Sequence, residues 1–206
     1  MKVPLVLATT NVHKIRELRS MLKGFSDLDL LSLTDFPQYV PPEETGSSFE
    51  ENAALKAMHA ATRLNLWVLA DDSGLVVPAL KGDPGIFSAR YAGTDATDAD
   101  NRKKLLEEMR NLVEEERNAY NECWLVLASP KGVEKVAHAT CEGSIVTQER
   151  GGSGFGYDPL FIKHGYGKTN AELGEVLKNR VSHRRKALDK IVPFLESYIR
   201  SQICTT

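Results

Sequence analysis

Hydrophobic and polar positions along the chain fall into two patterns. Short apolar runs bounded by turn residues predict buried strands, and these runs cover residues 3–8, 66–70 and 123–128. Apolar positions spaced three and four apart predict helices, and these begin after Asn11, Ser48, Thr97 and near Ser182. Strands that alternate with helices are typical of an α/β protein built around a sheet.

Two further segments have weaker patterns. Residues 26–46 are predicted to be irregular, because a weak apolar run from Leu28 to Leu33 is followed by three prolines. Residues 133–141 are predicted to pair back on the strand at 123–128 as a hairpin. Residues 143–147 are predicted to form a separate short strand.

The apolar run at residues 66–70 ends in Asp71, Asp72, Ser73 and Gly74. In an open α/β sheet, ligands bind beyond the carboxyl ends of the strands. Carboxylates at such a strand end are candidate metal ligands for a phosphate-bearing substrate. We therefore predict a chemical centre at Asp71, Asp72 and Ser73.

The first predicted strand leads through Thr9, Thr10 and Asn11 into a helix. Hydroxyl and amide side chains at this place cap helices, and a helix N-terminus attracts anions. Lys14, in the first turn, would add a positive charge for a phosphate. The alternative is an ordinary capped helix with a solvated lysine, and the segment alone does not decide between the two.

A glycine-rich segment covers residues 151–159. Its glycines fit neither the dinucleotide-binding pattern nor a P-loop. Phe155, among these glycines, is a candidate platform for stacking a base, since every base has a π-face. The alternative is an aromatic side chain that anchors a tight turn on the core.

The last predicted helix opens with His183, Arg184, Arg185 and Lys186. Cations at a helix N-terminus oppose the helix dipole, at a cost of a few tenths to ~1 kcal/mol each when exposed. We therefore expect an anionic or electron-rich group opposite this cluster, although solvent can reduce the cost.

Composition narrows the classes of protein. With 206 residues, 42% of them hydrophobic and 26% charged, the chain has the composition of a single globular domain. A formal net charge of −2 argues against a nucleic-acid binder. Three cysteines without Cys-x-x-Cys spacing suggest reduced thiols in a cytoplasmic protein. Neither a signal peptide nor a membrane span is predicted, so no membrane partner is expected.

Several blocks of sequence, in order along nearly the whole chain, resemble the inosine triphosphate pyrophosphatase-like family. Each block alone is weak, but their order makes the resemblance specific. The blocks are Ala8–Lys14, Glu44–Gly46, Phe49–Ala57, Ala70–Leu75, Pro84–Tyr91, Gly154–Pro159, Lys178 and Ser182–Arg184. The chain departs from the usual family pattern at Thr10, Ser153 and Leu177.

The resemblance implies an elongated α/β fold around a long mixed β-sheet with flanking helices. It implies one domain over residues 1–206, with two lobes and a central substrate cleft, in a homodimer. The implied activity is hydrolysis of non-canonical purine nucleoside triphosphates (ITP, dITP and XTP) to a monophosphate and pyrophosphate, with Mg²⁺. Such an enzyme removes damaged nucleotides from the precursor pool. The alternatives are a pyrophosphatase for modified pyrimidine triphosphates and a nucleotide-binding regulator without catalysis.

The resemblance also implies roles for individual residues. Glu44 and Asp72 would bind Mg²⁺, and Asp72 would also be the catalytic proton acceptor, with Asp71 as a supporting neighbour. Ser73 would contact the substrate. The residues expected to hold the phosphates are Thr9, Thr10, Asn11, Val12, His13, Lys14 and Lys56. Those expected to surround the nucleoside are Phe155, Gly156, Tyr157, Asp158, Lys178, His183 and Arg184.

Overall fold

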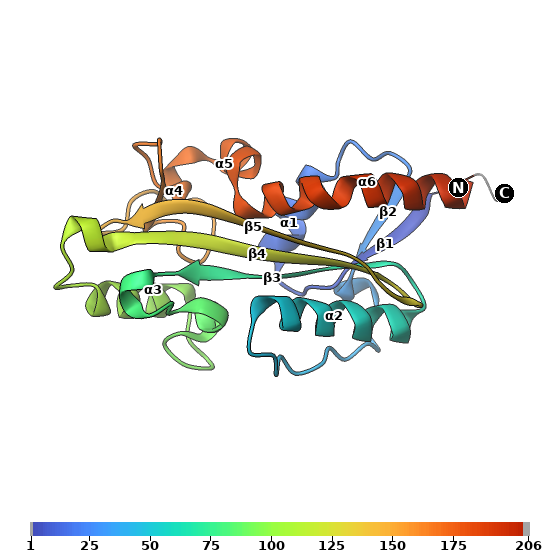
Figure 1. Ribbon diagram of the computed structural model, residues 1–206, viewed down its shortest axis with the longest axis horizontal. Helices are drawn as coiled ribbons and strands as arrows, with labels where there is room; N and C mark the ends of the chain where they lie inside the picture. Colours follow the sequence, from blue (N-terminus) through green and yellow to red (C-terminus); the bar gives the residue numbers. More distant parts are fainter. Residues whose placement is uncertain (1, 204–206) are drawn as a thin grey trace. The chain divides into compact units, whose positions relative to one another are not determined.

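The computed structural model describes residues 2–203, in which a six-stranded sheet is flanked by helices (Figure 1). The strand order is β2-β1-β3-β4-β5-β6. The strands are β1 (Val3–Leu7), β2 (Leu28–Ser32), β3 (Val68–Val76), β4 (Asn118–Ser129), β5 (Gly132–Ile145) and β6 (Phe161–Lys163). Strand β1 runs parallel to β2 and β3, whereas β5 and β6 are antiparallel. The sheet is therefore mixed, and the predicted α/β class is confirmed.

Six α-helices and four short 3₁₀ helices occur in the described chain. The α-helices are α1 (Val12–Met21), α2 (Phe49–Leu64), α3 (Asp98–Glu108), α4 (Asn170–Leu173), α5 (Glu175–Val181) and α6 (His183–Ile203). The 3₁₀ helices are η1 (Leu33–Asp35), η2 (Pro78–Leu80), η3 (Gly85–Arg90) and η4 (Glu114–Arg117). The helices predicted after Asn11, Ser48, Thr97 and near Ser182 are all present. No helix of residues 2–203 has the length and apolar character needed to cross a membrane.

Two predictions about strands were wrong. Residues 28–32 form β2, which pairs in parallel with β1 from Val3 opposite Leu28 to Leu7 opposite Ser32. Pairing with β1 satisfies the backbone hydrogen-bonding groups of β2, although the apolar pattern of its side chains is weak. Residues 143–145 belong to β5, because alternate residues from Ala137 to Ile145 stay buried without interruption.

The chain forms two compact units, each with its own hydrophobic core. Of the described residues, the first unit contains 2–72, 123–139 and 184–203, and the second contains 73–122 and 140–183. The boundaries fall inside β3, β4 and β5 and after the first residue of α6. These three strands therefore contribute residues to both units.

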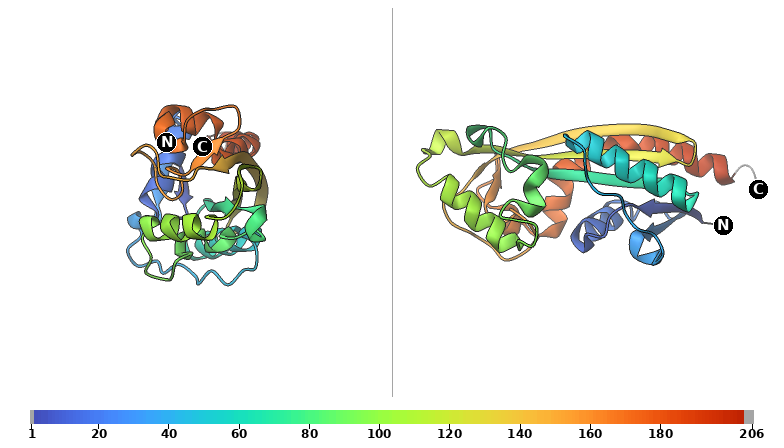
Figure 2. Two further views of the ribbon diagram at one scale, coloured as in Figure 1. Left: turned by 90° about the vertical axis from the view of Figure 1, so that its left-hand side faces the viewer. Right: turned by 90° about the horizontal axis from the view of Figure 1, so that it is seen from below.

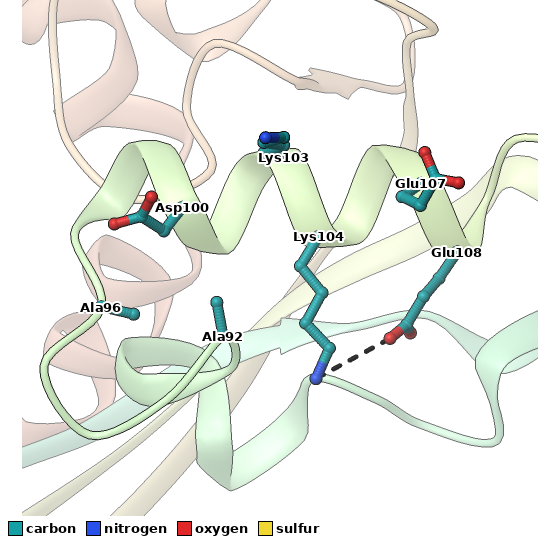
Figure 3. A pocket seen from close by; sticks show the side chains of 7 residues that line it. All are labelled: Ala92, Ala96, Asp100, Lys103, Lys104, Glu107 and Glu108. Carbon is teal, nitrogen blue, oxygen red and sulfur yellow. Dashed lines mark ion pairs between the residues drawn. The ribbon is translucent and has the colours of Figure 1, made fainter.

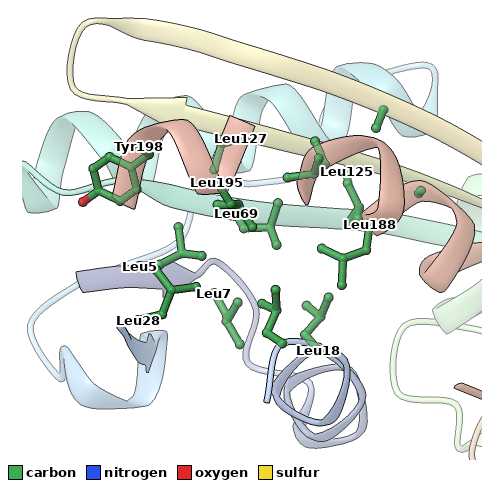
Figure 4. Close-up of a cluster of buried hydrophobic side chains, with 14 of the residues drawn as sticks. Leu5, Leu7, Leu18, Leu28, Leu69, Leu125, Leu127, Leu188, Leu195 and Tyr198 are labelled. Carbon is green, nitrogen blue, oxygen red and sulfur yellow. The ribbon is translucent and has the colours of Figure 1, made fainter. Parts of the chain in front are cut away.

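In the first unit, helices cover both faces of the sheet (Figures 1 and 2). Leu5, Leu69 and Leu125 point to the face that packs against α1 and α6 (Figure 4). Their neighbours Val68 and Val126 point to the opposite face, against the small residues of α2. Because side chains on a strand alternate between faces, adjacent residues of β3 meet different helices. This alternation decides where Asp71 and Asp72 point.

In the second unit, α3 and the ends of β3, β4 and β5 enclose a separate core. Its buried members include Leu75, Leu105, Met109, Cys141 and Phe161. Helix α3 begins at a capping box, in which Thr97 and Asp100 satisfy each other's backbone N–H groups. This core supports the loop that carries Phe155 to Asp158, since Tyr157 is one of its buried members.

Candidate active site

Asp71 and Asp72 lie inside β3, not at its carboxyl end as the sequence predicts. The strand continues through both carboxylates to Val76. Charged residues are tolerated within this buried strand because each carboxylate has cationic partners. Since neighbouring side chains point to opposite faces, Asp71 and Asp72 belong to two different clusters.

Asp71 lies on the face covered by α1 and α6, in a chain of alternating charges. Arg184 donates from Nε to Asp71 Oδ2 at 2.8 Å, and its Nη1 contacts Glu17 Oε2. The Lys14 ammonium forms an ion pair with Asp71 Oδ1. Arg184 is 2% exposed, Asp71 1% and Glu17 5%. The order Glu17, Arg184, Asp71, Lys14 therefore places negative and positive charges in turn across the interior of the first unit.

Burial and charge act against each other in this buried charge chain. Burial would raise the pKa of Asp71, but Arg184 and Lys14 outweigh it and hold this pKa well below its usual range. Burial would likewise lower the pKa of Arg184, but Asp71 and Glu17 keep it well above its usual value. Cys123 donates its thiol hydrogen to Asp71 Oδ2 at 3.2 Å, and burial raises the pKa of this thiol. Asp71 and Arg184 are therefore both ionised at neutral pH.

This buried chain also answers the question raised by the basic start of α6. The sequence leads us to expect an anionic group opposite these cations, and Asp71 and Glu17 are opposite Arg184. The next residue, Arg185, instead pairs on the surface with Asp189, one turn further along the helix. Only part of the basic cluster is therefore built into the interior.

Asp72 lies on the face covered by α2, where it meets Lys56. The Lys56 ammonium contacts Asp72 Oδ1 at 2.7 Å and Glu44 Oε1 at 2.9 Å. Two carboxylates from distant parts of the sequence thus converge on one cationic position. The structure brings together three residues that the family resemblance assigns to metal and phosphate.

The electrostatics of this group differ from those of the buried charge chain. Burial raises the pKa of Asp72, and this effect exceeds the opposing influence of Lys56 and Lys14. Burial would lower the pKa of Lys56, but Asp72 and Glu44 outweigh it and raise this pKa. Glu44 and Asp72 repel each other, and the lysine between them offsets that repulsion.

The donor set at Glu44 and Asp72 fits a hard divalent cation. Mg²⁺ is usually bound through one or two carboxylates, with water and substrate phosphates completing its ligands. In residues 2–203 no group of three or more His, Cys, Asp or Glu side chains could hold a metal ion. Glu44 and Asp72 supply two such carboxylates.

The loop before α1 is organised by side-chain caps. Asn11 Oδ1 accepts from the backbone N–H groups of His13 (2.9 Å) and Lys14 (3.2 Å). Thr9 Oγ1 accepts from the N–H of Asn11 at 3.1 Å. The N–H groups of Thr10 and Val12 have no hydrogen-bond partner among residues 2–203. Donors thus remain at this helix N-terminus, whose dipole favours an anion.

The second unit brings Phe155, Asp158 and Lys178 together. Lys178 Nζ contacts Asp158 Oδ2 at 2.5 Å and lies 4.6 Å from the centre of the Phe155 ring. Asp158 Oδ2 also accepts from the Phe155 N–H at 2.9 Å. Gly154, at φ +83°, passes so close that a Cβ there would collide with the Asp158 carboxylate. The loop is therefore folded tightly around Asp158, with one face of Phe155 against a lysine.

The remaining predicted residues of the second unit are held by its framework. Gly156 donates its N–H to Asp98 at 2.6 Å and accepts from Arg102 at 3.0 Å. The Tyr157 hydroxyl donates to the Ser88 carbonyl at 3.0 Å. Ser73 is half-buried within β3, and His183 is buried at the first turn of α6. Gly156 and Tyr157 therefore fix the shape of the loop that presents Phe155.

Sequence reasoning missed Glu17 and Cys123 as members of the cluster around Asp71. Glu17 lies three residues after Lys14 on α1, beside the buried Leu18. A carboxylate on the apolar face of a helix is the signal that could have indicated it, because buried charges are paired. Cys123 carries no such signal, since a buried cysteine in a strand usually only packs.

A surface hollow of about 560 Å³ lies elsewhere in the second unit, beside α3 (Figure 3). Within it, Lys104 pairs with Glu108 at 3.7 Å and donates to the Tyr91 carbonyl at 2.7 Å. Its residues are Ala92, Ala96, Asp100, Lys103, Lys104, Glu107 and Glu108. None of them is a predicted site residue, and the hollow is not part of the candidate site.

The mixed sheet, the paired carboxylates and the lysines together define a protein equipped to bind an anion and a metal ion. The model of the Ham1 family matches residues 5–194, and the chain belongs to this family. The resemblance seen in the sequence is thereby confirmed.

Three known proteins illustrate the relationship. A dITP/XTP pyrophosphatase of Protochlamydia amoebophila is 58% identical over 194 residues, 94% of this chain and 98% of that protein. A dITP/XTP pyrophosphatase of Chlamydia abortus is 52% identical over 200 residues, 97% of each chain. The structure of the Staphylococcus aureus Ham1 protein is 41% identical, with a TM-score of 0.83, over 95% of this chain and 99% of that one.

Replacing Arg184 by methionine tests the buried charge chain. We expect Arg184→Met to lower the free energy of unfolding by about 3–5 kcal/mol, because two buried carboxylates lose their shared cation. The neighbouring variant Arg185→Met removes an exposed i,i+4 pair and is expected to change stability by at most about 0.5 kcal/mol. Urea unfolding at pH 7 measures both. Equally small changes in the two variants would show that the buried charges around Arg184 do not contribute to stability.

Proposed function

We propose that the protein hydrolyses non-canonical purine nucleoside triphosphates, namely ITP, dITP and XTP, to a nucleoside monophosphate and pyrophosphate. The observation that carries this proposal is the convergence of Glu44 and Asp72 on the Lys56 ammonium. Carboxylates and a lysine at one point match a substrate that combines phosphates with a divalent metal ion. Relatives that are 50–58% identical are named dITP/XTP pyrophosphatases, which supports the same reaction.

In this proposal the first unit binds the triphosphate. Thr9 to Lys14 present the helix N-terminus and the Lys14 ammonium, and Lys56 supplies a second ammonium. Asp71 orients Lys14 through their ion pair. A lysine held by a buried carboxylate needs no further ordering when the anion binds, which favours affinity.

Glu44 and Asp72 are proposed to hold Mg²⁺. When bound, Mg²⁺ would offset the charge on the phosphates and lower the pKa of a coordinated water. Lys56 already lies between the two carboxylates, so they are kept together without the ion. With the ion held by Glu44 and Asp72, the Lys56 ammonium would be available to the phosphates.

Asp72 is proposed to orient the attacking water and to accept its proton. The water oxygen forms a bond to the α-phosphorus as the bond from this phosphorus to the bridging oxygen breaks. Pyrophosphate leaves with that bridging oxygen and its electron pair. A free aspartate titrates near ~3.9 and is a weak base, so positioning of the water is the main contribution of Asp72.

The second unit is proposed to bind the nucleoside. Lys178 covers one face of the Phe155 ring, so a purine would stack on the other face. Ser73, Gly156, Tyr157 and Asp158 complete this surface. His183 or Arg184 would donate to the 6-keto oxygen, which hypoxanthine and xanthine have and adenine lacks. Because Arg184 is engaged with Asp71 and Glu17, we favour His183 as the direct donor.

The setting proposed for the enzyme is the cytoplasm, where it would remove damaged nucleotides from the precursor pool as a homodimer. We propose no nucleic-acid partner, which is consistent with a formal net charge of −2. No membrane partner is proposed.

A nucleotide panel tests the reaction. With Mg²⁺, ITP, dITP and XTP are expected to give monophosphate and pyrophosphate at a higher kcat/KM than ATP and GTP. Product analysis by anion-exchange chromatography distinguishes pyrophosphate from orthophosphate, and chelation with EDTA should abolish turnover. Release of orthophosphate would contradict cleavage between the α and β phosphates.

The same panel separates the alternatives. Faster turnover of modified pyrimidine triphosphates would select a pyrimidine-specific pyrophosphatase. Binding without turnover of any nucleotide would select a regulator that retains the pocket.

Asp72→Asn tests the proposed role of this carboxylate. The variant is expected to lower kcat by about two to four orders of magnitude, because it removes the proton acceptor and one metal ligand. Steady-state kinetics on ITP with excess Mg²⁺ is the measurement. A kcat close to wild type under these conditions would remove Asp72 from the mechanism.

His183→Ala tests recognition of the keto group. We expect the ratio of kcat/KM for ITP to that for ATP to fall by about tenfold or more, because a site built for a hydrogen bond loses its selectivity with the donor. Parallel kinetics on XTP checks that the effect follows the shared keto oxygen. An unchanged ITP to ATP ratio would refute the assignment.

A further inference from the structure

Glu44 lies on a segment without helix or strand. We call residues 36–47 the strap, which joins η1 to the residue that caps α2. A strap of this kind has no hydrogen-bond ladder of its own, so its contacts with neighbouring elements decide where its side chains lie. The position of Glu44 therefore depends on what fastens the strap.

Between residues 36 and 46, the strap is fastened to a single face of α2. Three residues of the helix, spaced four and three apart, lie on that face and meet the strap in reverse order. The three pairs are Gly46 N with Asn52 Oδ1 (2.8 Å), Glu44 Oε1 with Lys56 Nζ (2.9 Å) and the Tyr39 hydroxyl with His59 Nδ1 (2.8 Å). Glu44 is thus the middle contact of three.

The end of the strap at Gly46 is tightly fixed. A Cβ on Gly46 would lie 2.6 Å from Asn52 Oδ1, so only glycine allows this approach. Ser47 donates its N–H and its hydroxyl to Glu51 at 2.7 and 2.8 Å. Several short-range contacts therefore hold this end independently of Glu44.

The other end of the strap borders a cavity of about 710 Å³. Its lining residues are Asp35, Phe36, Pro37, Gln38, Tyr39, Val40, Pro41, His59, Arg63 and Leu64. Across residues 36–43, all of which the structure describes, the bond from Tyr39 to His59 is the only side-chain hydrogen bond to α2. This end thus depends on one polar contact beside open space.

The Tyr39 ring supports that contact by packing. It lies partly buried against the apolar cluster beneath α2 and is tilted by 57° to the His59 ring, with the ring centres 5.5 Å apart. Burial raises the pKa of the Tyr39 hydroxyl, which keeps it protonated. Removing only the hydroxyl should therefore leave the ring in place and remove the hydrogen bond between Tyr39 and His59.

We propose that Tyr39 and His59 are positioning residues that hold the strap on α2 and so keep the Glu44 carboxylate beside Lys56 and Asp72. The proposal rests on the metal role proposed for Glu44. It assigns neither residue a contact with substrate or metal. Its consequence is that the strength of metal binding is set in part from His59, one turn of helix beyond Lys56.

Tyr39→Phe is the direct test, with Mn²⁺ as the probe. Titration of the purified protein with Mn²⁺, followed by electron paramagnetic resonance, is expected to show a Kd about two- to tenfold weaker than wild type, the worth of one hydrogen bond. The Mg²⁺ concentration for half-maximal hydrolysis of ITP should rise by the same factor. At saturating Mg²⁺, kcat should stay close to wild type.

Four further variants make the result specific. Glu44→Gln should abolish the Mn²⁺ binding that Tyr39→Phe weakens. His59→Asn keeps a side-chain amide near the position of Nδ1 and should restore most of the affinity that His59→Ala loses. Tyr198→Phe is the matched control, because it removes a tyrosine hydroxyl that donates to the Pro4 carbonyl (3.0 Å) in the same unit. It should lower the melting temperature without changing the Kd for Mn²⁺.

The outcomes separate this proposal from the proposed function. If wild type hydrolyses ITP and Tyr39→Phe leaves the Kd for Mn²⁺ unchanged, the positioning role is refuted and the function stands. If wild type binds Mn²⁺ but hydrolyses no nucleotide, the proposed function fails. The comparison of Kd values then still decides whether Tyr39 and His59 position Glu44. An equal loss of affinity in Tyr198→Phe would reduce the effect to general destabilisation. Absence of Mn²⁺ binding in wild type would overturn the metal role of Glu44 and with it the positioning role, whereas hydrolysis of ITP would still decide the function.

Discussion

The first unit depends on a carboxylate placed in the middle of a buried strand. Asp71 is 1% exposed, and without its partners it would cost several kcal/mol to keep ionised there. Arg184 and Lys14 come from opposite ends of the chain, and both approach this one side chain. The ion pairs therefore tie α1, β3 and α6 together, and Lys14 lies in the first turn of α1, just after the loop that is expected to receive phosphate.

A second set of charges uses the other face of the same strand. Asp72 meets Lys56 from α2, and Glu44 joins them from the strap. Asp71 is fully enclosed and its pKa is depressed, whereas burial raises the pKa of Asp72. Adjacent residues of one strand thus carry different properties, one suited to holding structure and the other to chemistry.

Much of this architecture is readable in the sequence, and the failures have physical causes. Helices with a capping residue and a regular apolar face, such as those after Asn11 and Ser48, are specified locally. Strand β2 is not, because its stability comes from pairing with β1 rather than from its own pattern. Acidic residues usually mark a strand end, and here β3 continues through two of them because their partners arrive from α1, α2 and α6.

For the site, sequence motifs name the residues but not their relations. The sequence blocks contain Asp72, Lys56 and Glu44. Only the tertiary structure shows that the Lys56 ammonium contacts both carboxylates. The blocks do not include Glu17, Tyr39 or His59. Contacts between residues 20 or more positions apart are invisible to local spacing.

The alternation along β3 has a consequence for the folding of the strand. A slip of one residue against β1, which pairs Val6 with Val68 and Leu7 with Leu69, would turn every side chain of β3 to the opposite face. Apolar side chains tolerate such an exchange in part, since both faces are hydrophobic. The two aspartates do not, because a slip of one residue brings at most one of them to the cations of the other and leaves the second buried without a partner that balances its charge. The aspartates that belong to the candidate site therefore also specify the register of β3. A chain folded in the wrong register would be destabilised by an unpaired buried charge and would lack the site.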